Sequence, residues 1–378
     1  MSKEYTSLGL MSGTSGDGVD ASIIRSDGVS KFEVIDNKYF EYDEKIYQNI
    51  HNLKERLYDI DDLKKLEKEI NELKRKITLF HAQVIKKFNN INIDIVGFHG
   101  QTIFHSAQKK ISKQLADGGL LFQLVKKNIV YDFRQNDIKN GGEGAPLTPI
   151  FHQLITTQEK INLPVCILNI GGISNVTIVN RPVGSFGFTS RDIGPGNCLI
   201  DSWVRKNSKK KFDEDGLLAL KGKKNEIIFE QAQELFFNRP NQNTLSFDVN
   251  DFDVSFARGL SLEDGSATLT DFTASIIGTA LTNLLQNEKN KIYKVLLCGG
   301  GRKNSILIEK IKQNTLDNII LQSIDDYGID GDFVESQAFA FLAIRTLKGL
   351  PITFPDTTGC SKPVTGGKII STQKTEFK

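Results

Sequence analysis

The chain has 378 residues, more than one domain usually holds, so its length predicts two domains. Its 48 basic and 46 acidic side chains leave a formal net charge of +2, which excludes a strong overall field for nucleic acid or an anionic membrane. Apolar residues make up 39% and charged residues 25%, a composition typical of a globular protein rather than a disordered one. Four scattered cysteines and the lack of an apolar stretch of about 18 residues predict a reducing, cytoplasmic location and no membrane partner.

The first predicted element, within residues 7–25, is an apolar strand, a polar turn and a second strand. The turn, residues 12–18, reads SGTSGDG and is called here the first glycine turn. Its glycines would let the backbone approach a polyanion, its amides and hydroxyls would donate hydrogen bonds, and its carboxylate could hold Mg²⁺. An ordinary hairpin turn can have the same composition, so the residues alone leave phosphate binding open.

Residues 41–87 combine many charges with apolar residues at intervals of three and four, which predicts one or two amphipathic helices. Residues 93–105 then predict a strand, a turn and a second strand or helix start, and residues 128–133 predict another strand. The motifs GFHGQT and DFRQND in these segments supply rows of hydrogen-bonding side chains, which suit sugar hydroxyls and carboxylates. A histidine at a strand end, such as His99, is also commonly just a hydrogen-bonded polar residue.

Residues 165–180 repeat the opening layout of strand, glycine turn and strand, with Gly171 and Gly172 as the second glycine turn. Residues 294–313 place the third glycine turn, Gly299–Gly301, between an apolar strand and a helix, where free backbone amides suit a phosphate or nucleotide edge. Neither a P-loop nor a Rossmann pattern occurs. The repeated layout predicts an α/β protein with two related halves.

Asp192 precedes a Gly-Pro-Gly turn and the helix-like residues 198–204. Phosphoryl transfer needs a base or positioning carboxylate beside the acceptor, and Asp192 is a candidate. An aspartate there can equally serve as a turn or capping residue, so this motif alone leaves its role open. Two further helices are predicted at residues 271–285 and 335–349, the second with an apolar face for a core.

These motifs resemble those of the anhydro-N-acetylmuramic acid kinases, a family of the actin, hexokinase and Hsp70 superfamily. The stretch GLMSGTSGDGVDASI is similar to the family signature GLMSGTSxDGVDA, and GFHGQT, DFRQNDI, GGEGAPLTP, NIGGISNVT, DIGPGN, CGGGRKN and FVESQAFAFLA follow in the family's order. The similarity runs from about Leu8 to Gly367. It implies an α/β fold with two actin/hexokinase-like (ribonuclease H-like) domains flanking a cleft for ATP and substrate. Residues 1–135, completed by part of the C-terminal region, would form one domain and residues 136–378 the other.

The resemblance implies a reaction in which ATP, Mg²⁺ and water open the 1,6-anhydro ring of anhydro-N-acetylmuramic acid and phosphorylate the freed O6. It implies Asp192 as the base that activates water and Glu335 as a second carboxylate on the substrate side. His99, Gln101 and Arg134 match sugar-contacting motifs. The residues implied for ATP binding are Gly13, Thr14, Ser15, Gly16, Asp17, Gly18, Val19, Asp20, Gly171, Gly172, Gly299, Gly300 and Gly301, with Asp17 and Asp20 as Mg²⁺ anchors.

Three departures from the family pattern stand out. Gly16 replaces the usual Leu or Met and is expected to loosen the first glycine turn, Ile193 replaces a Thr, and residues 238–252 are divergent. Two other functions stay open: a kinase of the same fold for another amino sugar or a hexose, and a non-enzymatic nucleotide switch of the actin or Hsp70 kind. The family resemblance also implies a homodimer.

Overall fold

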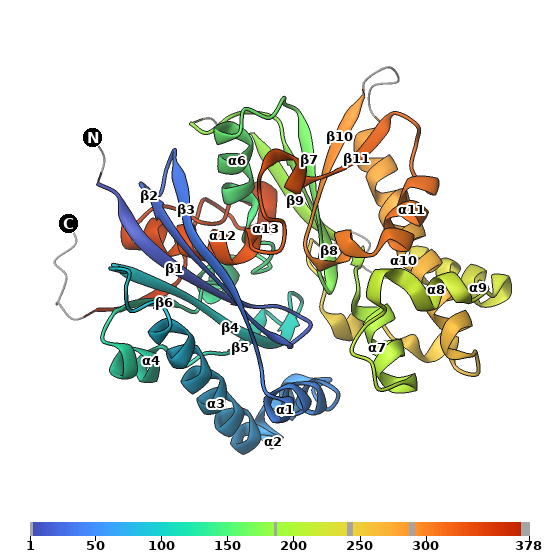
Figure 1. The fold of residues 1–378 in the computed structure, drawn as a ribbon, viewed down its shortest axis with the longest axis horizontal. Helices are drawn as coiled ribbons and strands as arrows, with labels where there is room; N and C mark the ends of the chain where they lie inside the picture. Colours follow the sequence, from blue (N-terminus) through green and yellow to red (C-terminus); the bar gives the residue numbers. More distant parts are fainter. Residues whose placement is uncertain (1–2, 185–186, 240–244, 287–291, 372–378) are drawn as a thin grey trace. The chain divides into compact units, whose positions relative to one another are not determined.

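The protein is described by a computed structural model over residues 3–184, 187–239, 245–286 and 292–371 (Figure 1). Its chain forms two compact units: the first comprises Met1–Leu163, Arg181–Thr189 and Asp332–Lys378, and the second Pro164–Asn180 and Ser190–Gly331. The predicted domain boundary at residue 135 falls inside the first unit. Residues 136–163 belong there because their helix packs against a C-terminal helix of the same unit.

Within the described residues, the first unit contains a seven-stranded sheet in the order β12-β6-β4-β1-β2-β3, with β5 paired to β4. Its strands are β1 (Tyr5–Ser12), β2 (Gly18–Ser26), β3 (Phe32–Glu41), β4 (Ile95–Ser106), β5 (Ile111–Leu115), β6 (Asn128–Tyr131) and β12 (Lys368–Ile370). Strands β1 and β2 are antiparallel and enclose the first glycine turn, so the predicted opening hairpin is confirmed.

The turn predicted inside residues 93–105 is wrong. Strand β4 continues through this segment beside β1, and the register shifts so that Leu10 pairs with Phe98 and Met11 with Gly100. His99 is therefore an extra residue, and Gly100 adopts a φ of 73° that favours glycine. A glycine in the motif thus marks an irregularity in a strand rather than its end.

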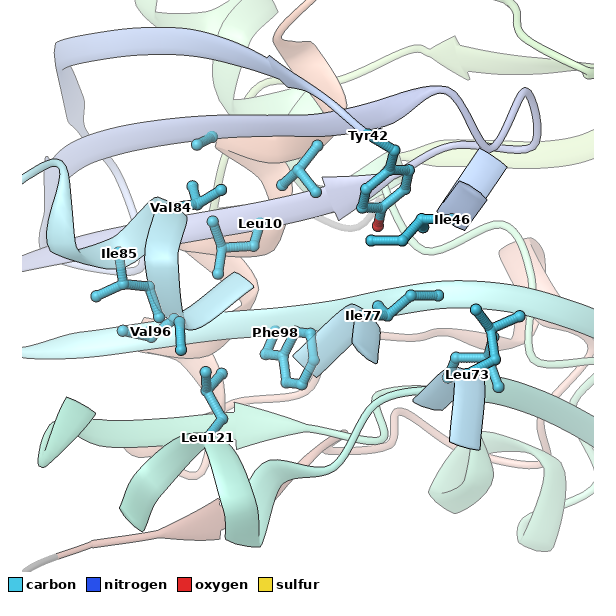
Figure 2. Packing of buried hydrophobic residues seen from close by; sticks show 14 of the residues in the cluster. Leu10, Tyr42, Ile46, Leu73, Ile77, Val84, Ile85, Val96, Phe98 and Leu121 are labelled. Atoms are coloured by element: carbon cyan, nitrogen blue, oxygen red, sulfur yellow. The ribbon is translucent and has the colours of Figure 1, made fainter. Parts of the chain in front are cut away.

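Helices cover both faces of this sheet. The helices of this unit are α1 (Glu44–Lys54), α2 (Ile60–Lys65), α3 (Glu67–Lys86), α4 (Gly118–Val125), α5 (Gln135–Lys139), α6 (Pro149–Gln158), α12 (Val334–Leu347) and α13 (Pro355–Thr358). Figure 2 shows Ile77 of α3 in one core with Leu10 and Phe98 of the sheet. On the other face α12 lies so close that a side chain on Gly9 or Gly97 would overlap its backbone. The helix predicted at 335–349 is confirmed, and residues 41–87 are helical as predicted but form three helices rather than one or two.

The second unit contains, among the described residues, a five-stranded sheet in the order β11-β10-β7-β8-β9. Its elements are β7 (Val165–Ile170), β8 (Ile173–Val179), β9 (Phe188–Pro195), α7 (Cys198–Asn207), α8 (Leu217–Lys221), α9 (Glu226–Phe237), α10 (Leu262–Leu285), β10 (Tyr293–Cys298), α11 (Ser305–Gln313) and β11 (Ile319–Ser323). The two sheets are separate, so the predicted α/β class with two sheet-containing halves is confirmed. Residues 240–244 of the divergent segment lie outside the described residues. None of the helices described is long and apolar enough to cross a membrane.

Candidate active site

The first glycine turn is supported from inside the first unit by a buried polar network. The Tyr42 hydroxyl donates to Ser12 Oγ at 3.1 Å, and Ser12 Oγ lies 2.6 Å from Gln101 Oε1 and 2.9 Å from the Gly18 carbonyl oxygen. Gln101 Nε2 donates to the Gly13 carbonyl oxygen at 2.9 Å. Gln101 is completely buried. Its amide therefore holds the turn, and the sugar contact that the motif implied stays a prediction.

Helix α1 holds the same turn, and Gln101 and His51 both lie beside Gly16. Lys54 Nζ donates to the Thr14 carbonyl oxygen at 2.9 Å. His51 Nε2 lies 2.9 Å from the Ser15 carbonyl oxygen and must carry the proton, because a carbonyl oxygen only accepts. Sequence analysis did not point to Lys54 and assigned no function to His51, since both lie some 40 residues beyond the turn in a charged, amphipathic segment.

Gly16 allows this close approach of α1. It has a φ of 62°, in the region that favours glycine, and a Cβ there would lie 2.9 Å from Ile50 Cγ2. The helix thus occupies the space that a larger side chain would need. Where the sequence led us to expect a looser turn, the structure shows a turn packed against a helix.

Carboxylates gather at the end of the first glycine turn. Ser15 Oγ donates to Asp17 Oδ1 at 2.5 Å, and Tyr42 N donates to the Asp17 carbonyl oxygen at 2.8 Å. Burial, followed by the negative charges of Asp17, Glu41 and Asp20, raises the pKa of Tyr39. The ionised form of Tyr39 is therefore disfavoured, and a cation beside these carboxylates would be favoured. No cluster of three or more His, Cys, Asp or Glu side chains suited to a metal occurs in the described ranges.

His99 and Arg134 are brought together by the bulge in β4. His99 Nδ1 lies 2.7 Å from the Gly100 carbonyl oxygen, while Nε2 accepts from Arg134 Nε at 3.2 Å and lies 3.0 Å from Arg134 Nη2. Arg134 Nη1 also donates to the Gly144 carbonyl oxygen at 2.7 Å. Burial, and then the charge of Arg134, hold the pKa of His99 well below its usual value. A neutral His99 therefore fixes the orientation of the guanidinium group.

Glu335 lies in the first turn of α12, where the helix dipole favours a carboxylate. The adjacent Ser336 anchors this turn, because its hydroxyl lies 2.6 Å from Ser22 Oγ and donates to the Phe333 carbonyl oxygen. The start of α12 is thereby tied to strand β2 of the same sheet.

The second glycine turn is held by backbone groups at the start of α7. Asn197 N donates to the Gly171 carbonyl oxygen at 2.8 Å, and the amides of Gly196 and Cys198 donate to that of Gly172 at 2.9 and 3.2 Å. A Cβ on Gly196 would overlap the Gly171 carbonyl oxygen. The sequence GPGN therefore serves to bring two backbone segments into contact.

Asp192 lies on β9, shortly before this contact, and is 6% exposed. Phe247 N donates to Asp192 Oδ2 at 2.8 Å, and Asp192 N donates to the Leu245 carbonyl oxygen at 2.8 Å. The neighbouring Ile193 is part of the hydrophobic core of the second unit. The isoleucine that stands in place of the usual Thr therefore contributes to packing. The main-chain amide of Phe247 holds the Asp192 carboxylate beside it.

The third glycine turn follows β10. Gly299 has a φ of 78° and donates through its amide to the Gly331 carbonyl oxygen at 3.0 Å, whereas a Cβ on Gly300 would meet nothing within 4 Å. Arg302 braces this turn: its Nη1 donates to the Gly299 carbonyl oxygen at 3.1 Å, and its Nε and Nη2 bind both carboxylate oxygens of Asp325 at 2.7 and 2.9 Å. The sequence did not indicate this brace, because Asp325 belongs to a different loop.

A family model described as anhydro-N-acetylmuramic acid kinase matches residues 5–372. The chain belongs to this family. It is 55% identical over 377 residues to the anhydro-N-acetylmuramic acid kinase of Pelagibacter ubique, covering 98% of this chain and 99% of the relative. The enzyme of the same name from Agrobacterium fabrum is 36% identical, with 98% and 100% covered. Among solved structures, a ROK family glucokinase from Streptomyces griseus in complex with glucose and AMPPNP is 10% identical, with a TM-score of 0.39 over 89% of this chain and 99% of that one.

In this member of the anhydro-N-acetylmuramic acid kinase family, the predicted site residues fall into two groups. The first unit carries the residues of the first glycine turn with His99, Gln101, Arg134 and Glu335. The second unit carries Asp192 and the second and third glycine turns. Within each unit, side-chain or backbone hydrogen bonds hold these motifs in place.

Proposed function

We propose that the chain is an ATP-dependent kinase that opens the 1,6-anhydro ring of 1,6-anhydro-N-acetylmuramic acid with water and phosphorylates O6. The products would be N-acetylmuramic acid 6-phosphate and ADP, in cytoplasmic recycling of cell-wall peptidoglycan. The observation that carries this proposal is the buried Asp192 carboxylate, held by Phe247 N within the family motif DIGPGN. A carboxylate with a fixed orientation is what water activation next to a phosphoryl acceptor requires.

In the proposed reaction, Asp192 takes a proton from water while the water oxygen forms a bond to C1 of the sugar. The C1–O6 bond breaks, and O6 forms a bond to the γ-phosphorus of ATP as the bond to ADP breaks. This joins a glycoside hydrolysis to a phosphoryl transfer. The proton on Asp192 is released to solvent afterwards, so atoms and charge balance.

For the sugar, we assign positioning roles to Glu335 and Arg134. Arg134 offers a planar group of donors that suits carboxylate and hydroxyl oxygens, and His99 and Gly144 limit its rotation. A guanidinium group held in one orientation loses less entropy when it binds. Gln101 we assign to the first glycine turn rather than to the sugar, since its amide already binds that turn.

Asp17 and Asp20 fit a Mg²⁺ ion that is bound mainly by phosphates and water. Mg²⁺ usually takes one or two protein carboxylates and keeps several waters, so it needs no dedicated cage of side chains. Besides burial, the negative charges of these two carboxylates help to raise the pKa of Tyr39, so the local field is negative. When bound, Mg²⁺ would neutralise phosphate charge, while Asp17 and Asp20 hold it at the end of the first glycine turn.

Mass spectrometry of early product formed in ¹⁸O-water tests the proposal. Hydrolytic ring opening puts one solvent oxygen on C1, and samples quenched within the first turnovers avoid later exchange at the anomeric centre. N-acetylmuramic acid, already open, serves as the control acceptor. A kinase for another amino sugar or a hexose would phosphorylate its acceptor without taking up solvent oxygen. A nucleotide switch would hydrolyse ATP regardless of added anhydro-sugar.

Light scattering tests the homodimer that the family implies.

A further inference from the structure

Three successive carbonyl groups of the first glycine turn are each bound by a side chain from another element. The Gly13 carbonyl accepts from Gln101 of β4, the Thr14 carbonyl from Lys54 of α1, and the Ser15 carbonyl from His51 of α1. Two of the three donors thus come from one helix. Ordinary hairpin turns need no such support, since their backbone hydrogen bonds close them.

The peptide geometry of the turn gives these contacts a direction. In a planar trans peptide the carbonyl and the following amide point in opposite directions. Carbonyls drawn toward Gln101 and Lys54 therefore turn the amides of Thr14 and Ser15 away from those side chains. Successive amides that point to one side form an anion-binding concavity. The Gly16 amide is used inside the turn, where it donates to the Gly13 carbonyl oxygen at 3.1 Å.

We propose that His51 and Lys54 are positioning residues that orient the first glycine turn of this enzyme to receive the phosphates of ATP. The inference deepens the proposed function and rests on it, because it assigns the turn to nucleotide phosphate. Gly16 contributes to the same arrangement, since its lack of a side chain lets Ile50 and the C-terminal half of α1 reach the turn. Lys54 adds a positive charge directly behind the backbone that meets the phosphates, which strengthens anion binding there.

Matched pairs of variants separate this role from general stability. Lys54→Met keeps the aliphatic stem and removes the donor, while Lys54→Arg keeps a charged donor. His51→Phe keeps a ring and removes the donor, while His51→Gln restores an amide hydrogen at a similar distance from the backbone. Lys45→Met on an exposed position of the same helix controls for the loss of one positive charge.

Calorimetry with Mg-ATP and with adenosine provides the readout, because adenosine has no phosphate to bind the turn. Loss of one charge-assisted hydrogen bond predicts roughly 5- to 20-fold weaker Mg-ATP binding in Lys54→Met, and a larger loss when His51→Phe is added. Adenosine affinity should stay within about twofold, since it does not depend on this turn. Lys54→Arg, His51→Gln and Lys45→Met should bind Mg-ATP within roughly threefold of the unmodified protein. KM for ATP should rise with KM for the sugar unchanged.

Unchanged Mg-ATP affinity in the double variant would overturn the inference. So would an equal loss of adenosine affinity, which would mean that α1 only stabilises the fold. The proposed function is judged separately on the unmodified protein, by turnover that requires anhydro-sugar. A different sugar specificity would overturn that function and leave the contrast between Mg-ATP and adenosine readable.

Discussion

The first and second glycine turns share a strand–turn–strand layout but are held by different groups. Side chains from α1 and β4 bind the carbonyls of the first turn, at distances of 2.9 Å from Gln101, Lys54 and His51. Backbone amides at the start of α7 bind the carbonyls of Gly171 and Gly172 in the second turn. The first support can be removed by side-chain substitutions, whereas the second depends on two chain segments fitting together.

This difference shows which substitutions can alter the conformation of each turn. A turn that is bound by side chains can be tuned by substitutions far along the chain, and Gly16 with α1 is an instance in this protein. A turn bound by backbone amides tolerates many side chains but requires glycine where the segments touch, as at Gly196. The second turn is therefore the more rigid of the two, and Asp192 lies on the strand that leads to Gly196, which contacts this turn.

The largest effect is expected for Asp192→Asn, which tests whether the carboxylate near the second glycine turn activates water for ring opening. Asparagine keeps the size of the side chain and can still accept the hydrogen bond from Phe247 N, but it does not take a proton from water. Ring-opening kcat should fall roughly 10²- to 10⁴-fold, or about 3–5 kcal/mol of barrier, with little change in binding. Turnover with anhydro-sugar is the measurement. Near-normal kcat in a folded variant would remove Asp192 from the mechanism and favour Glu335.

The next effect contrasts Gly196, which contacts the second turn, with Gly13 of the first turn. In Gly196→Ala the new Cβ would overlap the Gly171 carbonyl oxygen, so the backbone must shift and both stability and ATP binding should fall. In Gly13→Val the nearest atom to the Cβ is Ser15 Oγ at 3.8 Å, so the fold should survive while ATP affinity falls roughly 10-fold or more. Gly300→Val, also in open space, should behave like Gly13→Val.

Thermal unfolding and ATP titration check this contrast together. Equal melting temperatures for Gly196→Ala and Gly13→Val would show that the second turn adjusts easily to a new side chain. The second turn would then not be the more rigid of the two. Unchanged ATP affinity in both Gly13→Val and Gly300→Val would contradict the assignment of the glycine turns to the nucleotide.

The sequence predicted the turns but not their supports. Apolar alternation broken by glycines gave both hairpins and the third turn, since these are local patterns. Lys54 and His51 were missed because a charged residue of an amphipathic helix has no pattern that tells which element it touches. His99 and Gly100 were assigned to a turn because glycine usually ends a strand, whereas here the neighbouring strand continues the pairing across a bulge. Contacts between distant segments decide such cases, and one sequence does not contain them.

Arg302 provides an intermediate case, a side-chain support for a turn in the second unit. In Arg302→Met the Gly299 carbonyl and the Asp325 carboxylate both lose the guanidinium group that connects them, although each keeps other hydrogen bonds, so Mg-ATP binding should weaken about 3- to 10-fold. Adenosine should weaken by the same factor, because the third glycine turn is assigned to that part of the nucleotide. This outcome is opposite to the one expected for Lys54→Met. Adenosine binding that stays normal in Arg302→Met would contradict that assignment.

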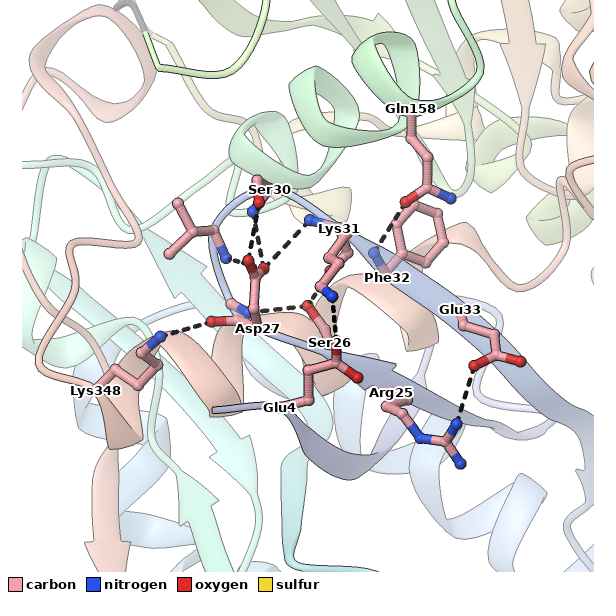
Figure 3. A network of polar contacts seen from close by, with 12 residues as sticks. Glu4, Arg25, Ser26, Asp27, Ser30, Lys31, Phe32, Glu33, Gln158 and Lys348 are labelled. Atoms are coloured by element: carbon pink, nitrogen blue, oxygen red, sulfur yellow. Dashed lines mark hydrogen bonds and ion pairs between the residues drawn. The ribbon is translucent and has the colours of Figure 1, made fainter. Parts of the chain in front are cut away.

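The smallest effect concerns stability, at the far end of the hairpin formed by β2 and β3. The Asp27 carboxylate accepts from the amides of Val29, Ser30 and Lys31, and Lys348 Nζ donates to the Asp27 carbonyl oxygen at 2.7 Å. Figure 3 shows Ser30, Lys31 and Lys348 around Asp27. Burial alone would raise the pKa of Asp27, but the hydrogen bonds from Ser30, Val29 and Lys31 outweigh it and hold the pKa at about 2. This loop, like the first glycine turn, depends on a side chain.

Because the pKa of Asp27 in the folded protein lies below the ordinary 3.8, its stabilising effect is present above about pH 4 and is lost as the pH falls through about 2. The shift corresponds to at most about 2 kcal/mol of unfolding free energy. Asp27→Asn should therefore lower the urea midpoint at pH 7, and the difference from the unmodified protein should shrink as the pH falls from 4 to 2. Asp61→Asn, whose side chain is 77% exposed, is the matched control and should behave like the unmodified protein at every pH. A difference for Asp27→Asn that stays constant down to pH 2 would mean that the loop is held by its backbone, as the second glycine turn is.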